Sequence, residues 1–206
     1  MLIEKDNLLF EELKIKYKNN KQVIIFNQDV LKFDFEKKLK KNVIIFGNLP
    51  YNISSQILTK IIKFKNWPPA YSNLILMFQK ELAERIIGKF NTSKYGRLSI
   101  LTSYRLRILS KFNISPNCFL PKPKVISTIL SFAPIKRINH EIKNLENLEK
   151  VTNVLFSNKR KMINKNIKKI LTKQSLEKIK DLNLSSRPSD LRPEKYYEIT
   201  ELFEKF

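Results

Sequence analysis

The chain has 206 residues, 42% of them hydrophobic, which is enough for one sizeable core and a small second domain. A formal net charge of +21 predicts a polyanionic partner and favours nucleic acid over a membrane surface, although AT-rich codon usage also enriches lysine. One cysteine and one histidine exclude an internal disulfide and a usual zinc site, and without a signal peptide or a membrane-length apolar run we expect a metal-free cytoplasmic monomer.

Short apolar strands alternate with helices in the first half of the chain. The predicted strands are 2–4, 23–26, 43–46 and 74–78, and the predicted helices are 8–17, 54–62 and 79–85. Pro68 and Pro69 prevent the second helix from continuing. This alternation predicts a parallel α/β sheet in which the strands are buried.

The pattern changes after residue 96. A helix near 97–105 leads to strands near 107–114 and 125–132, which have no helix between them and therefore predict an antiparallel hairpin at a sheet edge. A polar linker at 133–146 precedes helices at 145–157, 159–172, 174–180 and 193–204. We therefore expect an α/β domain at 1–135 and a small all-α domain at 136–206.

Residues 157–173 contain seven lysines and arginines and no acid. An ordinary charge run is a solvated helix face, but seven uncompensated positive charges repel one another on a helix. We therefore favour a surface that contacts RNA phosphates. Its candidate residues are Lys159, Arg160, Lys161, Lys165, Lys168 and Lys169.

The sequence Asn48-Leu49-Pro50-Tyr51 follows the apolar run at 43–46. The Asn48 side-chain oxygen and the Leu49 carbonyl can both accept hydrogen bonds from one exocyclic amine, and Pro50 fixes the local φ. Tyr51 offers a ring on which a base can stack. Two acceptors on one amine also make its nitrogen a better nucleophile towards a methyl group. A four-residue sequence of this kind occurs by chance in many turns. The prediction of a base clamp therefore also depends on the strand before it and the helix after it.

Several short segments are informative when they are taken together in chain order. They are Ile3-Glu4-Lys5-Asp6, Asp29-Val30-Leu31, Gly47–Ser54, Phe78-Gln79-Lys80-Glu81, Tyr95–Ser99, Phe119–Ser127, Phe156–Met162 and Arg187–Leu191. In this order the chain resembles the rRNA adenine dimethyltransferase family over essentially its whole length, most closely the branch that dimethylates two adjacent adenosines near the 3′ end of 16S rRNA.

The resemblance implies a Rossmann-like methyltransferase that uses S-adenosylmethionine. Glu4 would accept hydrogen bonds from the cofactor ribose, and Asp29 would read the cofactor adenine amine, although an exposed charge and a turn or cap residue are the plain alternatives. Asn48 would contact the cofactor and, with Leu49, Pro50 and Tyr51, clamp the flipped adenosine. The implied partner is the small-subunit rRNA or the immature 30S subunit.

Part of the family pattern is absent. No Gly-rich cofactor loop precedes Glu4, and the three glycines are Gly47, Gly88 and Gly96. We therefore expect that the sequence begins inside the fold. A start placed too far downstream is favoured over a genuine fragment. Residues 1–206 alone should therefore bind S-adenosylmethionine weakly or not at all.

Three other functions stay open at this point. A non-catalytic RNA-binding factor for small-subunit assembly would need no Gly-rich loop, but it would also need no base clamp. A relative that modifies large-subunit rRNA fits the basic segment and the Arg187-Pro188 tail less well. A DNA adenine methyltransferase is the weakest alternative because no segment resembles a sequence-reading module.

Overall fold

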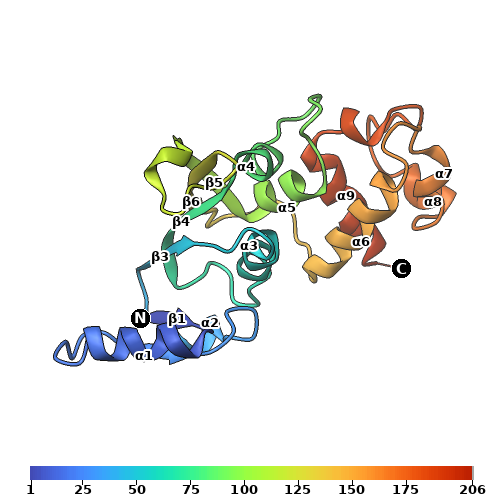
Figure 1. Cartoon of the computed structure of the whole chain (residues 1–206). Helices are drawn as coiled ribbons and strands as arrows, with labels where there is room; N and C mark the ends of the chain where they lie inside the picture. Colours follow the sequence, from blue (N-terminus) through green and yellow to red (C-terminus); the bar gives the residue numbers. More distant parts are fainter. Residues whose placement is uncertain (206) are drawn as a thin grey trace.

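Four strands form the larger sheet in the computed structural model, which describes residues 1–205 (Figure 1). They are β3 (Val43–Asn48), β4 (Tyr71–Gln79), β5 (Leu106–Ile114) and β6 (Ser127–Pro134). Their order is β3-β4-β6-β5, with β3 parallel to β4 and the other neighbours antiparallel. The predicted edge hairpin is therefore confirmed, with β5 at the edge.

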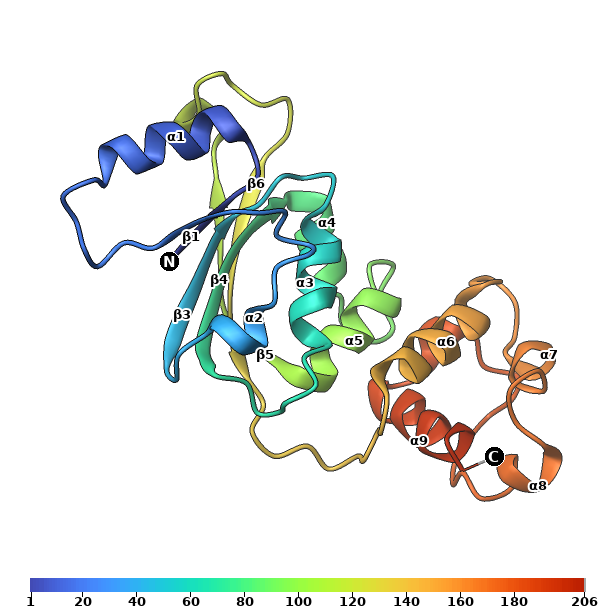
Figure 2. The ribbon, with the colours of Figure 1, turned by 90° about the horizontal axis from the view of Figure 1, so that it is seen from below.

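The core lies on one face of this sheet. Leu74 pairs with Phe132 and Leu76 with Leu130, and all four side chains are fully buried. Three helices cover this face (Figure 2). They are α3 (Ser54–Ile62), α4 (Lys80–Ile86) and α5 (Arg97–Arg105). Alternation of side chains along the strands thus turns β4 and β6 into the floor of the core.

A second, two-stranded sheet carries the beginning of the chain. Its strands β1 (Leu2–Glu4) and β2 (Ile25–Asn27) are parallel, and α1 (Asn7–Lys16) connects them. Asp6 caps α1 by accepting hydrogen bonds from the amides of residues 8 and 9. The short helix α2 (Phe35–Lys38) follows.

The two sheets share no strand pairing among residues 1–205. Parallel pairing is present within each sheet, but the expectation that the strand at 43–46 is buried is wrong. Val43 and Ile45 are half-buried, and Ile44 is 50% and Phe46 70% exposed, because only alternate side chains of β3 face the core.

Between β6 and residue 205 the chain forms only helices and turns. The helices are α6 (Leu145–Phe156), α7 (Asn164–Ile167), α8 (Lys173–Leu176) and α9 (Pro193–Phe203), with a 3₁₀ turn at Pro188–Asp190. A second 3₁₀ turn, Pro116–Cys118, lies between β5 and β6. The predicted long helices at 159–172 and 174–180 are wrong, since each holds one short helix. The amide of Ile163 bonds to the carbonyl of Ser186 instead of continuing a helix, and the repulsion of neighbouring lysines adds to this break.

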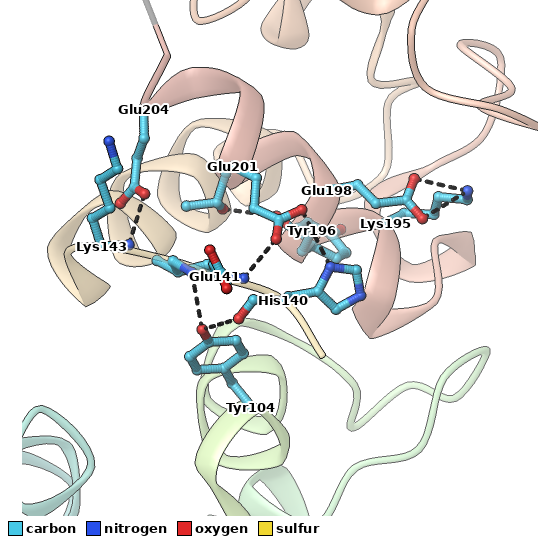
Figure 3. A network of polar contacts seen from close by, with 11 residues as sticks. Tyr104, His140, Glu141, Lys143, Lys195, Tyr196, Glu198, Glu201 and Glu204 are labelled. Carbon is cyan, nitrogen blue, oxygen red and sulfur yellow. Dashed lines mark hydrogen bonds and ion pairs between the residues drawn. The ribbon is translucent and has the colours of Figure 1, made fainter. Parts of the chain in front are cut away.

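The predicted linker at 133–146 is bonded on both sides (Figure 3). Tyr104 of α5 donates its hydroxyl to the His140 carbonyl and accepts the Ile142 amide, at 2.7 and 3.2 Å. Glu201 of α9 accepts the amide of Glu141, and Glu204 accepts the amides of residues 143 and 144. This polar stretch therefore fastens the C-terminal helices to α5.

The buried tyrosines make stability depend on pH. Burial raises the pKa of four phenols far above its usual value: Tyr71, Tyr95, Tyr196 and Tyr197. Because the folded state favours the neutral phenol, this contribution is fully present below the unfolded pKa of about 10 and is lost as pH rises above it. We expect unfolding to begin above about pH 10. Phenolate absorbance of these tyrosines should then appear together with the loss of helical circular dichroism, whereas ionisation without unfolding would contradict the packing.

Candidate functional site

The predicted base clamp lies where β3 ends and α3 begins. Asn48 is the last residue of β3, and Ser54 is the first residue of α3. Between them the amide of Ile53 donates to the Pro50 carbonyl at 3.2 Å, which closes a tight turn. The turn therefore places the four motif residues at the carboxyl end of a parallel strand, where open α/β sheets bind their ligands.

Tyr51 is held at both ends. Its hydroxyl shares a 2.6 Å hydrogen bond with the Ser127 hydroxyl, and its carbonyl accepts the Ser54 hydroxyl at 3.0 Å. Ser54 and Ser127 are both fully buried, whereas Tyr51 is half-buried. Ser127 is the first residue of β6, so the ring is positioned by an element 76 residues further along the chain.

Asn48 and Leu49 point in different directions. The Asn48 side chain is exposed and makes no hydrogen bond to any other residue of the described chain, which leaves its oxygen available to a ligand amine. The Leu49 side chain packs against the hydrophobic core. This anchor fixes the backbone of the turn.

Gly47 makes room for that anchor. A Cβ on Gly47 would lie 2.5 Å from Leu49 Cδ2 and 2.9 Å from Leu76 Cδ2, both closer than real contacts. We expect Gly47→Ala to push Leu49 aside and to lower the predicted methyl-transfer activity by about tenfold, the cost of about 1.4 kcal/mol of overpacking. Rates from radiolabelled methyl transfer would measure this, with Gly96→Ala as the control because a Cβ there meets nothing closer than 3.9 Å. Equal rates for the two variants would contradict the steric argument.

The two predicted cofactor carboxylates lie at one edge of the smaller sheet. Glu4 ends β1, and Asp29 follows β2 by two residues. The Asp29 carboxylate accepts the Leu31 amide at 2.9 Å and pairs with Lys5 at 3.0 Å. These two contacts, the amide first, lower the pKa of Asp29, so the group stays an ionised acceptor.

Glu4 and Asp29 are thus brought together, but they are not joined to the clamp. Within residues 1–205, no hydrogen bond or ion pair links either carboxylate to Asn48 or Tyr51. The carboxylate of Glu4 instead accepts the amide of Asp6 at 2.8 Å. Acceptors for ribose hydroxyls and for an adenine amine are present, and Lys5 would have to release Asp29 for a ligand to reach it.

The basic segment is exposed but not uniformly free. The ammonium of Lys159 donates to the carbonyls of Ser93 and Tyr95, at 2.9 and 3.2 Å, so it fastens the loop before α5. The other candidate residues are exposed: Arg160, Lys161, Lys165, Lys168 and Lys169. The structure therefore offers five of the six cations to solvent without such an internal bond.

A cavity lies away from these residues. It has a volume of about 790 Å³ and lies between α2, α3 and the first turns of α6. Lysines and carboxylates alternate on its walls, and Lys63 pairs there with Glu149 at 2.7 Å. This mixed charge gives no preference for an anionic ligand.

Ser127 and Lys5 are the contacts that the sequence did not reveal. Ser127 ends the segment that begins at Phe119, but its role in holding Tyr51 depends on sheet order, which the sequence pattern does not give. Among the described residues, no cluster of three His, Cys, Asp or Glu side chains could hold a metal ion. No helix within residues 1–205 is long and apolar enough to cross a membrane.

The fold and the turn at 48–51 define a Rossmann-like methyltransferase. A family model described as ribosomal RNA adenine dimethylase matches residues 1–205. The chain belongs to this family.

Named relatives and solved structures agree with this assignment. The chain is 41% identical over 205 residues to Ribosomal RNA small subunit methyltransferase A of Pelagibacter ubique (strain HTCC1062), covering 98% of this chain and 77% of that protein. It is 39% identical to the protein of that name from Malacoplasma penetrans (strain HF-2), covering 95% and 70%. A dimethyladenosine transferase from Plasmodium falciparum has a TM-score of 0.74 at 23% identity, covering 96% of this chain and 79% of that one, which shows the fold.

Proposed function

We propose that this protein transfers methyl groups from S-adenosylmethionine to N6 of two adjacent adenosines near the 3′ end of 16S rRNA during small-subunit biogenesis. The turn at 48–51, with Tyr51 held by Ser127 at 2.6 Å, carries this proposal. The relatives named as small-subunit methyltransferases support it. They also disfavour a non-catalytic assembly factor.

The proposed chemistry depends on positioning. The target adenosine leaves its stack, rests on Tyr51, and donates both amine hydrogens to Asn48 and the Leu49 carbonyl. When bound, S-adenosylmethionine would supply a methyl group on a reactive sulfonium and would leave as the neutral thioether once its carbon–sulfur bond breaks, so no strongly shifted base is needed. After transfer N6 releases a proton, and the exposed position of Asn48 lets water accept it. Glu4 and Asp29 would hold the ribose and the adenine of the cofactor.

We also propose a division of labour along the chain. Residues 1–135 would form the methyltransferase domain and residues 136–206 a helical domain that binds rRNA through the exposed cations of the basic segment. The net charge of +21 and the exposure of those cations support this division. We propose that a cytoplasmic monomer acts on the immature 30S subunit, and sedimentation of the protein with and without 30S subunits would test both points.

Methyl transfer tests the proposed function. Radiolabelled S-adenosylmethionine would be incubated with the protein and 30S subunits that lack the two dimethyladenosines, followed by primer extension across the 3′ end. We expect two adjacent modified adenosines, and none with Asn48→Ala. Label at other positions, or undiminished label with Asn48→Ala, would contradict the proposal.

The separation of the two sheets predicts weak cofactor binding by residues 1–206 alone. Glu4 ends β1 and Asp29 follows β2, and neither strand pairs with β3, so no shared ladder fixes the distance of these carboxylates from Asn48. Lys5 also competes for Asp29. We expect a dissociation constant above about 0.1 mM by calorimetry, equivalent to less than about 5.5 kcal/mol. Micromolar binding by a folded sample would refute this prediction.

A further inference from the structure

We propose that the β5–β6 hairpin and its connecting loop, residues 106–134, form a second RNA-contacting surface that holds the strand next to the target base. This inference rests on the proposed function and adds a binding surface apart from the basic segment 157–173. Figures 1 and 2 place the hairpin and helices α7 and α8 at opposite ends of the molecule. The two surfaces would therefore contact different parts of the RNA.

The charged side chains of this part of the sequence are all basic. Between residues 85 and 140 the sequence has eleven lysines and arginines and no aspartate or glutamate. Four of these cations are exposed on the hairpin and its loop: Arg107, Lys111, Lys122 and Lys124. None of the four forms an ion pair within residues 1–205; Glu84, whose charge interacts with Lys111, is paired with Lys94 at 3.2 Å. Uncompensated cations on one exposed element fit a phosphate backbone.

Apolar side chains are exposed among these cations. Phe112 is 64% exposed on the edge strand β5, and Leu120 is fully exposed at the tip of the loop. Val125 and Ile126 are each 40% exposed. Rings and apolar side chains between cations are typical of surfaces that bind single-stranded RNA, because bases stack on them while the cations track the backbone.

The loop is tied directly to the clamp. Its last residue, Ile126, accepts the amide of Lys80 through its carbonyl, and the next residue, Ser127, bonds to the Tyr51 hydroxyl. Ile114, at the other end of the loop, pairs with Ser127 across the hairpin. Lys124 is three residues from Ser127, so its backbone lies within about 11 Å of the residue that holds Tyr51. A strand whose base rests on Tyr51 would therefore have its neighbouring phosphates within reach of Lys122 and Lys124.

Salt-dependent RNA binding by the full chain tests this surface without requiring catalysis. The probe is a fluorescently labelled RNA with the sequence of the 3′ end of 16S rRNA, and the variant is Lys122→Gln/Lys124→Gln. The slope of log K against log salt is negative, and each lost phosphate contact should reduce its magnitude by about 1. We therefore expect a slope that is shallower by about 2 for this double variant. Phe112→Ala should weaken binding by about tenfold with the slope unchanged, because stacking is not ionic.

The matched control removes the same charge elsewhere. Lys40 and Lys41 are exposed and precede β3 at the strand end opposite the clamp, so Lys40→Gln/Lys41→Gln should leave the slope within about 0.5 of the unmodified chain. If Lys122→Gln/Lys124→Gln behaves like this control while the unmodified chain binds, the hairpin surface is refuted and the proposed function stands. If the unmodified chain does not bind the rRNA probe, both proposals fail.

Discussion

Replacing Tyr51 with alanine should lower the rate of methyl transfer at saturating RNA by about 5- to 150-fold, because base stacking contributes about 1–3 kcal/mol. Affinity for rRNA should fall by less than about threefold, since phosphate contacts dominate binding. Single-turnover rates and filter binding on the same 30S subunits would measure the two quantities. Equal losses in rate and affinity would show that Tyr51 only packs.

The hydrogen bond between Tyr51 and Ser127 allows a more specific test of how the ring is positioned. Tyr51→Phe and Ser127→Ala each remove the 2.6 Å bond but keep the ring. Each should lower the rate by about 2- to 10-fold, the net value of one hydrogen bond. Because both variants remove the same interaction, the double variant should be no slower than the slower single variant.

Thr128→Ala provides the control for this cycle. Thr128 is as buried as Ser127 and follows it in β6, but its hydroxyl bonds to Asn113 and not to Tyr51. Its removal should cost stability without lowering the rate of the folded enzyme. If Ser127→Ala and Tyr51→Phe combine additively, the bond does not position the ring.

The sequence predicted the local elements better than their arrangement. The helix predicted near 97–105 is present at those bounds, and the strand at 43–46 was recognised from its apolar run. The long helix at 159–172 failed because Ile163 bonds to Ser186, a contact that depends on tertiary structure. Local periodicity does not report such a partner.

The candidate site shows the same division. The acceptors of Asn48 and Leu49 follow from four consecutive residues, so the sequence alone predicted them. The bond from Tyr51 to Ser127 requires β6 to lie beside β4, and the pairing of Lys5 with Asp29 requires β1 to lie beside β2. Both contacts depend on strand order, which residue patterns leave open.

Replacing Arg105 with methionine should destabilise the protein by about 3 kcal/mol, more than most single substitutions. Arg105 Nη1 donates to the carbonyls of Ile62 and Phe64, at 2.7 and 2.6 Å, and so satisfies the end of α3. The guanidinium also lies 4.6 Å from the centre of the Trp67 ring. Methionine would fill part of the volume but leave both carbonyls without this donor.

Arg105 affects stability through its charge as well as through its hydrogen bonds. Burial lowers the pKa of Arg105, so the buried guanidinium carries a desolvation cost that its two carbonyl contacts offset. Each carbonyl left without a donor costs about 1–3 kcal/mol. Removing the guanidinium also recovers its desolvation cost, and the expected loss of about 3 kcal/mol already allows for this gain. Lysine at this position would keep the charge but lacks the planar group that stacks on Trp67, so Arg105→Lys should recover about half of the loss.

Urea unfolding would measure these changes, with Arg107→Met as the matched control. Arg107 lies two residues away on β5 and is exposed, so the same substitution there should change stability by less than about 0.5 kcal/mol. A loss below about 1 kcal/mol for Arg105→Met would show that water replaces the guanidinium at the end of α3. Because α3 begins at Ser54, which bonds to the Tyr51 carbonyl, Arg105 anchors the far end of the helix that carries the clamp. The folded fraction of Arg105→Lys should therefore also transfer methyl groups more slowly than the unmodified chain.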